Sequence, residues 1–319
     1  MKKMMCITAI ITAFMLLVPL AVLGEGSDSE VAVTQTTAVV KTEKKKTDIF
    51  KVYNHETKEI TEMSADDYIF CVVAAEMPAL YNVEAIKAQA VASYTYACYK
   101  REENKSKEYD ISTDFNTDQS FKTEEKARAD WGENAQEYVN KNKNAITEVS
   151  SEKITYKGET ILAVYHAVSS GVTYSAEDVW GKQIKYLKSV DSAGDKTAKK
   201  YMQTFEFPES ELKEKLGSLI SKPKDNTPIL GEVIAKENGL VEYVKVYGQK
   251  VKGSDIRTAL GLASSNFKFE KNDGKYIFTT LGYGHGVGMS QNGANVLANE
   301  GKNYKQILKH YYTGTKISK

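Results

Sequence analysis

The chain has 319 residues, with 43 lysines and arginines against 42 aspartates and glutamates, so its net charge is close to zero. This balance excludes the large basic field that holds many proteins on nucleic acid, and we expect no nucleic-acid partner. The length allows one large domain or two small ones behind an export segment.

The N-terminus predicts an export segment. Two lysines precede a mostly apolar, uncharged stretch from Met5 to Leu23, whose length lies between that of a signal peptide and that of a membrane-spanning helix. The residues around Val22 to Gly24 make a poor cleavage site, which favours an uncleaved anchor at 1–24 with the lysines inside and the rest outside the cell membrane. Secretion after cleavage is the alternative.

A polar linker separates this segment from the folded part. Residues 25–49 are rich in Gly, Ser, Thr, Glu and Lys and have no apolar period, which predicts a solvated tether before a domain at 50–319. Beyond the anchor only Cys71 and Cys98 remain, in apolar stretches with helical spacing. We expect two buried thiols, with a disulfide between them as the alternative.

Helical patterns dominate the first half of this domain. Pro78 separates two of them within 65–100, the first with Ile69, Val72 and Val73 on one stripe and the second beginning at Asn82, a good N-cap. Residues 101–145 are polar, and we expect irregular structure there with a surface helix around 123–143.

Strand patterns appear from residue 149 onward. Three hairpins are predicted, with turns at 157–158, 237–239 and 272–274, each containing glycine. Between them we expect a loop at 174–181, a helix at 209–220 capped by Ser210, and an amphipathic turn after Ser254. Helices follow at both ends of 290–312. Because no regular strand–helix–strand alternation occurs, we predict a mixed α+β fold with two subdomains.

The segment GYGHGVGMSQNGA, residues 282–294, places glycine at every second position from Gly282 to Gly288. A strand of this kind has one face without side chains, where another backbone or a flat ligand can approach, and presents Tyr283, His285 and Val287 on the other. The glycine spacing fits neither a dinucleotide fingerprint nor a P-loop, and a lone histidine makes a poor metal site. A packing strand and a binding strand both remain open on these residues alone.

This segment, together with HYYTG at 310–314, resembles the C-terminal signature of the stage II sporulation protein D family, which includes amidase-enhancer domains. Three further blocks resemble the family in the same order: VVAAEMPALYNVEAIKAQAVASYTYA, YHAVSSGVTYSAEDVWG and SDIRTALGLASSNF. The resemblance covers residues 50–315. It implies that 50–319 is a lytic transglycosylase, a lyase that cuts peptidoglycan between N-acetylmuramic acid and N-acetylglucosamine during engulfment, with a groove for glycan strands. A wall amidase and a polytopic membrane protein are the partners it implies.

Glu76 is the predicted catalytic acid. It follows Val72 and Val73 by four and three positions, so a continuing helix puts it on their apolar face, where partial desolvation favours the protonated form that a general acid needs. A glutamate that accepts from backbone donors near Pro78 is the structural alternative. Ordinary glycosidases use two carboxylates, and Asp178 is the nearest rival, although we expect it to cap a loop. The resemblance implies that Glu76 alone acts as acid and base while the sugar's own 6-hydroxyl forms a 1,6-anhydro product.

The resemblance also implies a substrate-binding set. Lys87 is expected to bind sugar or to stabilise an ionised Glu76, with a solvated lysine as the alternative, and His285, Ser290 and Gln291 are expected to line the groove opposite Glu76. The complete predicted set is Lys87, Gln89, Tyr94, His166, Ser170, His285, Ser290 and Gln291, to which Ser169 and Trp180 are added.

Two departures from the family pattern matter. Tyr94 stands where many relatives have arginine. Some relatives also carry a Cys-x-x-x-x-His-Cys-Gln cluster that can hold zinc, but the aligned stretch from Ser112 to Asp118 has lost those ligands and only Gln119 remains, so we predict neither metal nor cofactor. These departures keep a second hypothesis open, a wall-binding module that stimulates an amidase without cutting glycan.

Overall fold

The computed structural model describes residues 48–221 and 227–319. The predicted anchor at 1–24 and the linker up to residue 47 lie outside the described residues, and both stay predictions. Within the two described ranges, no helix combines the length and the apolar character needed to cross a membrane.

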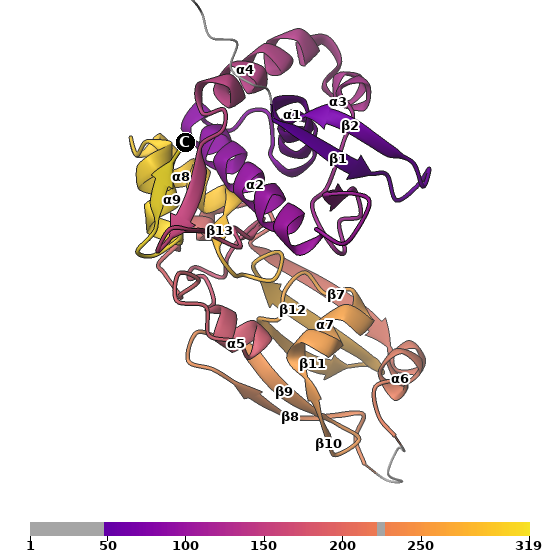
Figure 1. The fold of residues 1–319 in the computed structure, drawn as a ribbon. Coiled ribbons are helices and arrows are strands. Elements are labelled where there is room, and N and C mark those ends of the chain that lie inside the picture. Colours follow the sequence, from indigo (N-terminus) through magenta and orange to yellow (C-terminus); the bar gives the residue numbers. More distant parts are fainter. Residues whose placement is uncertain (1–47, 222–226) are drawn as a thin grey trace, which may run out of the picture. The chain divides into compact units, whose positions relative to one another are not determined.

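The predicted α+β class is confirmed (Figure 1). The helices are α1 (Ala65–Glu76), α2 (Val83–Glu103), α3 (Glu124–Trp131), α4 (Ala135–Glu148), α5 (Ala176–Trp180), α6 (Glu209–Gly217), α7 (Gly253–Leu260), α8 (Gln291–Asn299) and α9 (Tyr304–Tyr311). The strands are β1 (Ile49–Tyr53), β2 (Ile60–Ser64), β3 (Ile111–Ser112), β4 (Lys153–Tyr156), β5 (Glu159–Thr160), β6 (Tyr165–His166), β7 (Met202–Pro208), β8 (Leu230–Ala235), β9 (Val241–Val246), β10 (Gln249–Lys252), β11 (Phe267–Asn272), β12 (Lys275–Leu281), β13 (Met289–Ser290) and β14 (Lys316–Ser318).

Helix α2 is central to the first hydrophobic cluster. It packs against α1, α4, α8 and α9, which surround it in Figure 1. Ala85, Ala88 and Ala92 are fully buried on it, and their small side chains let the neighbouring helices approach closely. Asn82 begins the helix as predicted, since its side chain accepts a hydrogen bond from the Glu84 N–H at 3.0 Å. Cys71 and Cys98 are both buried free thiols, as expected.

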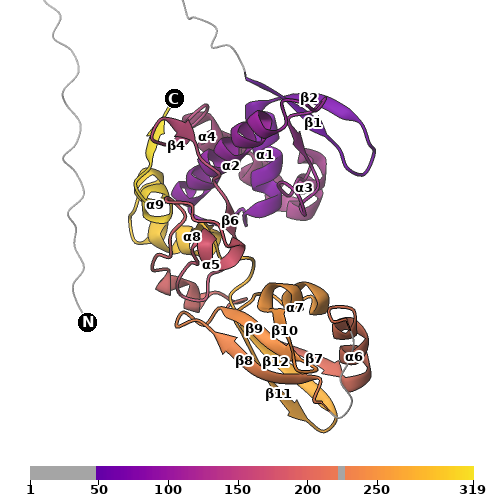
Figure 2. The same cartoon turned by 60° about the horizontal axis from the view of Figure 1, so that its bottom comes forward.

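A second hydrophobic cluster forms between two antiparallel sheets, β10–β9–β8 and β11–β12–β7, and the helices α6 and α7 (Figure 2). Phe278 on β12 is fully buried there between Phe207 and Phe267. Residues 46–319 nevertheless form one compact unit, so two hydrophobic clusters are present but the predicted division into two subdomains is not confirmed.

The predicted hairpin turns and the predicted breaks between helices are confirmed. Hairpins connect β4 to β5, β8 to β9 and β11 to β12 at the expected glycine turns. Helices α1 and α2 end and begin on either side of Pro78, and α8 and α9 occupy the two ends of 290–312. Each of these features depends on residues that are neighbours in the sequence.

Several local predictions were wrong. The expected surface helix at 123–143 is two helices, α3 and α4, interrupted at Gly132, whose φ of 55° an ordinary helix does not allow. The loop expected at 174–181 contains α5, because the Ser175 hydroxyl caps it by accepting from the Asp178 N–H. Pro208 rather than Ser210 precedes α6, and α7 begins at Gly253, before Ser254.

The segment 282–288 is not a strand either. All four of its alternate glycines have positive φ, between 75° and 111°, which interrupts a continuous ladder and leaves isolated bridges of Tyr283 to Val168 and of Val287 to Tyr174. Regular pairing resumes at β13, which runs parallel to β6. The segment therefore lies along residues 164–174 without forming a sheet edge.

Candidate active site

Glu76 is the last residue of α1, and Pro78 determines that position. The residue before a proline avoids helical geometry, and Met77 is accordingly extended, with φ −116° and ψ 135°. The helix thus stops at Glu76, whose side chain is half-buried rather than immersed in the core. The carboxyl group is left free to meet other segments of the chain.

Two donors from distant segments meet this carboxyl group. The Ser120 backbone N–H donates to Glu76 Oε1 at 3.0 Å, and the Gln291 side-chain amide donates to Oε2 at 3.3 Å. Gln291 is the first residue of α8 and is 5% exposed. The sequence placed Glu76 on an apolar helix face with Gln291 opposite it, and the structure adds direct hydrogen bonds from Gln291 and from the Ser120 backbone.

Behind Gln291 a buried polar chain continues into α2. The Gln291 amide also reaches Gln89 Oε1 at 3.5 Å, and the Gln89 amide donates to the Ser93 hydroxyl at 3.0 Å. Gln89 and Ser93 are both completely buried. The structure therefore places Gln89 next to the site as predicted, but as a support of Gln291 rather than as a residue that a substrate could touch.

A second polar chain, from Gln119, flanks the same carboxyl. The Gln119 amide donates to the Tyr165 hydroxyl at 2.8 Å and its carbonyl accepts from the Tyr68 hydroxyl at 3.1 Å. Burial raises the pKa of Tyr165 well above its ordinary value, and the charge of nearby Glu76 raises it further. Tyr165 is thus a neutral phenol that lies within electrostatic reach of Glu76.

The glycine segment brings the histidines to this region by close backbone contact. A Cβ on Gly284 would lie 2.9 Å from His166 Cβ, and one on Gly288 would lie 2.0 Å from the Val164 carbonyl oxygen. The rings of His166 and His285 are consequently only 5.7 Å apart. The predicted close approach is confirmed, although its cause is positive-φ turns and not a flat strand face.

Both histidines are neutral at ordinary pH. Burial lowers the pKa of His166 to about 4, and burial together with the neighbouring His166 lowers the pKa of His285 to about 3. His166 Nδ1 donates to the Val287 carbonyl at 3.1 Å, while its Nε2 is buried without a partner among the described residues. His285 Nδ1 accepts from the Val287 N–H at 3.1 Å, so the two rings can exchange hydrogen bonds with a neutral ligand but cannot act as cations.

Lys87 and Tyr94 do not make the contacts that the sequence predicted. The Lys87 ammonium pairs with Glu84 at 2.9 Å and with Glu148 at 2.6 Å, so its partners are these two carboxylates and not Glu76. The Tyr94 hydroxyl donates to Asp48 at 2.9 Å, and its ring packs against Phe50. Both side chains hold α2 against neighbouring elements.

Ser290 and Ser170 also have structural partners. Ser290 is fully buried, and its hydroxyl caps α8 by accepting from the Gly293 N–H at 3.1 Å, so it positions Gln291 rather than lining a groove. The Ser170 hydroxyl is hydrogen-bonded to the Tyr174 hydroxyl at 2.8 Å. The buried Ser169 likewise lies in a hydrogen-bonded turn, where its hydroxyl accepts from the Gly171 N–H.

In the stretch aligned with the zinc cluster of some relatives, the side chain of Asp118 is held by a hydrogen bond and an ion pair within the protein. Asp118 accepts from the Ser112 N–H at 2.9 Å and pairs with Lys100 at 3.3 Å. A carboxylate with an ammonium partner thus occupies a cysteine position of that pattern, and Gln119 beside it faces the two tyrosines. Among the described residues, no group of His, Cys, Asp and Glu could hold a metal ion.

Three contributors to the site were missed from the sequence: the Ser120 N–H, Tyr165 and Tyr68. Tyr165 directly precedes His166 in the block YHAVSSG, which is a signal that could have drawn attention to it. A backbone N–H carries no such signal, because any residue at position 120 would supply it. The predicted residues that the structure does bring together are Glu76, Gln89 and Gln291, with the pair His166 and His285.

Comparisons with known proteins show which family the chain resembles. A family model described as stage II sporulation protein, SpoIID, matches residues 53–156. The chain is 35% identical over 274 residues to stage II sporulation protein D of Bacillus amyloliquefaciens, which covers 85% of this chain and 78% of the relative. The same identity over 271 residues relates it to stage II sporulation protein D of Bacillus subtilis (strain 168), covering 84% and 78%. The amidase enhancer of Bacillus subtilis (strain 168) is 24% identical over 298 residues, covering 77% of this chain and 40% of that protein.

Proposed function

Because the chain belongs to the stage II sporulation protein D family, we propose that it is a peptidoglycan lytic transglycosylase in which Glu76 is the only catalytic carboxyl group. One observation carries the proposal. A half-buried glutamate at the end of α1 receives hydrogen bonds from two segments, at Ser120 and Gln291, which are 44 and 215 residues away in the sequence. Such convergence is typical of a site that holds one carboxyl group in a defined position.

The reaction needs one proton donor that later becomes a proton acceptor. Glu76 gives its proton to the glycosidic oxygen between N-acetylmuramic acid and N-acetylglucosamine, and the bond from that oxygen to the anomeric carbon breaks. The oxygen of the muramic acid 6-hydroxyl forms a new bond to the anomeric carbon, and the Glu76 carboxylate takes the hydroxyl proton. The products are a 1,6-anhydro end and a free sugar end, no water is consumed, and Glu76 is regenerated.

The surroundings of Glu76 suit both halves of this cycle. Glu76 is half-buried at the end of α1, so a sugar bound over its carboxyl group would exclude water while the proton is transferred. Once the proton has left, the Ser120 N–H and the Gln291 amide stabilise the carboxylate. The buried chain through Gln89 keeps the amide of Gln291 oriented.

The test is the product of the full-length protein, in mild detergent, acting on peptide-free glycan strands. Mass spectrometry should detect anhydro-muramyl ends, which are lighter by one water than hydrolytic ends. Glu76→Gln should abolish them, because an amide cannot donate the proton, and we expect at least a thousandfold loss. Glu102→Gln, an exposed glutamate on α2, is the matched control and should retain full activity. New ends made by Glu76→Gln at the wild-type rate would refute the proposal.

A second function is favoured by one comparison. The similarity to an amidase enhancer supports a module that grips glycan and stimulates an amidase without cutting the strand. In that case the same experiment would show glycan binding without new ends. Tyr94 lends this alternative less weight than the sequence suggested, because its hydroxyl bonds Asp48 at the start of the described chain.

The cellular setting follows from the same proposal. We expect the protein to act on the cell wall during sporulation, in engulfment, anchored by residues 1–24 with the catalytic domain outside, or secreted if that segment is cleaved. A wall amidase that removes stem peptides is the expected partner, since peptide-free strands would be its product, and a polytopic membrane protein is the second. Co-purification from sporulating cells would identify both.

A further inference from the structure

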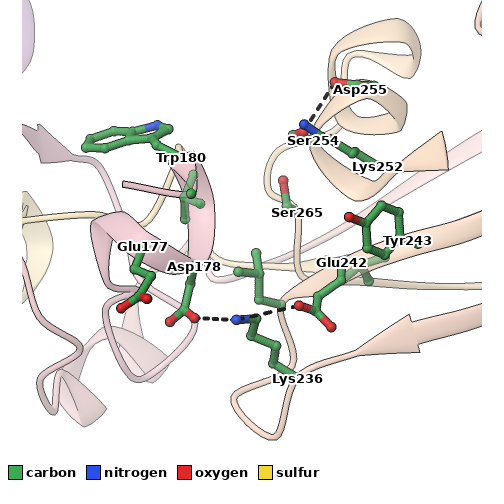
Figure 3. Close-up of a pocket in the computed structure, with 14 residues that line it drawn as sticks. Glu177, Asp178, Trp180, Lys236, Glu242, Tyr243, Lys252, Ser254, Asp255 and Ser265 are labelled. Atoms are coloured by element: carbon green, nitrogen blue, oxygen red, sulfur yellow. Dashed lines mark hydrogen bonds and ion pairs between the residues drawn. The ribbon is translucent and has the colours of Figure 1, made fainter. Parts of the chain in front are cut away.

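A cavity of about 470 Å³ opens beside α5 (Figure 3). One wall comes from α5 and Gly181 after it, and the other from the β8–β9 turn, β9, the end of β10, the start of α7 and the loop at Ser265. Its volume lies within the range of small-ligand sites, roughly 300–1,000 Å³. The proposed reaction makes no use of it, and of the predicted substrate-binding residues Trp180 lines it.

The lining combines hydrogen-bonding groups with one exposed aromatic ring. Glu177 and Asp178 face Ser254, Ser265 and Tyr243 across the cavity in Figure 3. Carboxylates accept hydrogen bonds, and hydroxyl groups donate or accept them. A neutral ligand with many hydroxyl or amide groups is the chemistry that such walls recognise.

The charged groups of the cavity are partly paired with one another. The Lys236 ammonium bridges Asp178 and Glu242, with the second contact at 3.5 Å. Glu177 and Asp255 remain with Lys252, so the lining carries four carboxylates against two ammonium groups, and this excess of negative charge disfavours an anionic ligand. The bridge also ties α5 to the hairpin of β8 and β9, which holds the two walls together.

Trp180 connects this cavity to the candidate active site. It lies at the rim on the α5 side and is 43% exposed, so part of its side chain is open to a ligand. Its ring lies 5.7 Å from the ring of His285, and His285 is hydrogen-bonded to the backbone of Tyr165, the phenol next to Glu76. Contacts through Trp180, His285 and the Tyr165 backbone therefore link the cavity to the region of Glu76.

From this arrangement we propose that the cavity is a saccharide subsite that holds a sugar ring of the glycan strand away from the bond that is cut, with Trp180 as its apolar platform. The apolar face of a pyranose packs on the indole while its hydroxyl and N-acetyl groups bond the carboxylates and hydroxyls of the walls. The identity of the strand rests on the proposed function, but the subsite does not require that Glu76 cuts it. Its role is to hold long strands more tightly than short ones.

Tryptophan fluorescence tests the subsite directly, because the chain has only two tryptophans. Trp131 is packed against Phe70 and Tyr138, away from the cavity, so Trp131→Phe leaves Trp180 as the reporter. In the full-length Glu76→Gln, Trp131→Phe protein, long peptide-free glycan strands should change the Trp180 emission and a disaccharide should not. In Glu76→Gln, Trp180→Ala should weaken binding of long strands about tenfold without changing that of the disaccharide.

A second variant protects the test against a folding defect at Trp180. Ser265→Ala removes one hydroxyl from the opposite wall and should weaken long strands about threefold, the loss expected for one hydrogen bond. An unchanged Trp180 emission together with unchanged affinity in both variants would overturn the subsite. Competition by soluble stem peptides, with no effect of glycan, would overturn it in favour of a peptide site.

The two proposals fail separately. If the wild-type protein makes no anhydro ends but Trp180 still responds to strands, the reaction is refuted and the subsite stands. The opposite outcome is that the wild-type protein forms anhydro ends and Trp180→Ala cuts both long and short strands with the wild-type KM. In that case the reaction stands and the subsite is refuted.

Discussion

Alternate glycines at 282–288 show how single residues determine the geometry of the site. Each adopts a positive φ, and three of them would place a Cβ within 3 Å of a backbone atom or an aromatic ring: Gly282, Gly286 and Gly288. The missing side chains let residues 164–174 approach, and this approach aligns His166 with His285. These glycines are therefore needed both because they adopt positive φ and because a Cβ at their positions would overlap with neighbouring atoms.

Comparing Gly288→Ala with a matched control should separate the cost of steric overlap from the cost of backbone strain. Its Cβ would lie 2.0 Å from the Val164 carbonyl oxygen at a φ of 75°, so strain and overlap together should cost about 3 kcal/mol or more of unfolding free energy. Gly158→Ala has a φ of 92° but nothing within 4 Å, so only strain of about 1–2 kcal/mol is expected. Urea denaturation measures both, and equal losses would mean that close approach is unimportant at Gly288.

His166 should make stability depend on pH in a defined window. In the unfolded chain its pKa returns to 6.5, whereas burial holds it near 4 in the folded protein, so below pH 6.5 the unfolded state binds more protons and stability falls. Between pH 6.5 and 5 this histidine alone should cost about 1.5 kcal/mol. His166→Gln should make that slope clearly shallower in denaturation curves, while buried His285, whose pKa is also lowered, maintains part of it.

Val168→Ala is the control for this measurement. Val168 is 7% exposed and carries no titratable group, so its loss should lower stability equally at both pH values. A slope in His166→Gln as steep as in the wild type would show that other groups cause the pH dependence.

At the scale of elements, the residue that begins α2 is hydrogen-bonded to the second half of α8. Asn82 caps α2 and also donates from its side chain to Asn299 Oδ1 at 3.1 Å, while its backbone N–H donates to Asn295 Oδ1 at 2.8 Å. The helix that carries Gln89 is thereby attached to the helix that begins with Gln291. The two amides behind Glu76 depend on this attachment for their alignment.

Asn82→Ala should accordingly cost about 1–2 kcal/mol of unfolding free energy, the upper part of the range for an N-cap. Asn134 provides a matched control, because it precedes α4 without making a side-chain cap, so Asn134→Ala should change stability by about 0.5 kcal/mol or less. Thermal or chemical denaturation compares the two. Similar losses at both positions would show that the cap at α2 contributes nothing specific.

At the scale of the whole molecule, the question is whether two hydrophobic clusters unfold together. Residues 46–319 form one compact unit, and hydrogen bonds such as that of the Gly284 N–H to the Ala263 carbonyl, together with the Lys236–Asp178 ion pair, join the segments that carry the clusters. We therefore expect one cooperative transition.

Phe278→Ala tests this expectation from the second cluster. Phe278 is fully buried, and its truncation should cost about 3–5 kcal/mol. In a Trp180→Phe background, Trp131 reports on the first cluster, against which it packs. The unfolding midpoint measured by Trp131 fluorescence should decrease by the same amount as the unfolding midpoint measured by circular dichroism. A fluorescence midpoint that stays in place would mean that the clusters unfold separately.

Much of the local structure follows from the sequence by itself. The Asn82 cap, the helix end before Pro78, the glycine turns of three hairpins and the two buried thiols all depend on residues a few positions apart, where side-chain and backbone rules act directly. The same short-range signals placed Glu76 in the helix before Pro78, although on a continuing helix and not at its last residue, and four ordered blocks identified the family. Short-range rules failed at α5 and at Gly132, where a cap and a positive φ could not be recognised from composition.

Only the tertiary structure decided what surrounds Glu76. Its partners Ser120 and Gln291 lie 44 and 215 residues away, and the bond from Gln119 to Tyr165 spans 46. No periodic pattern encodes such contacts, because they arise when separate elements pack and each buried polar group finds a partner. For the same reason Lys87, predicted beside Glu76, is paired with Glu84 and Glu148 instead.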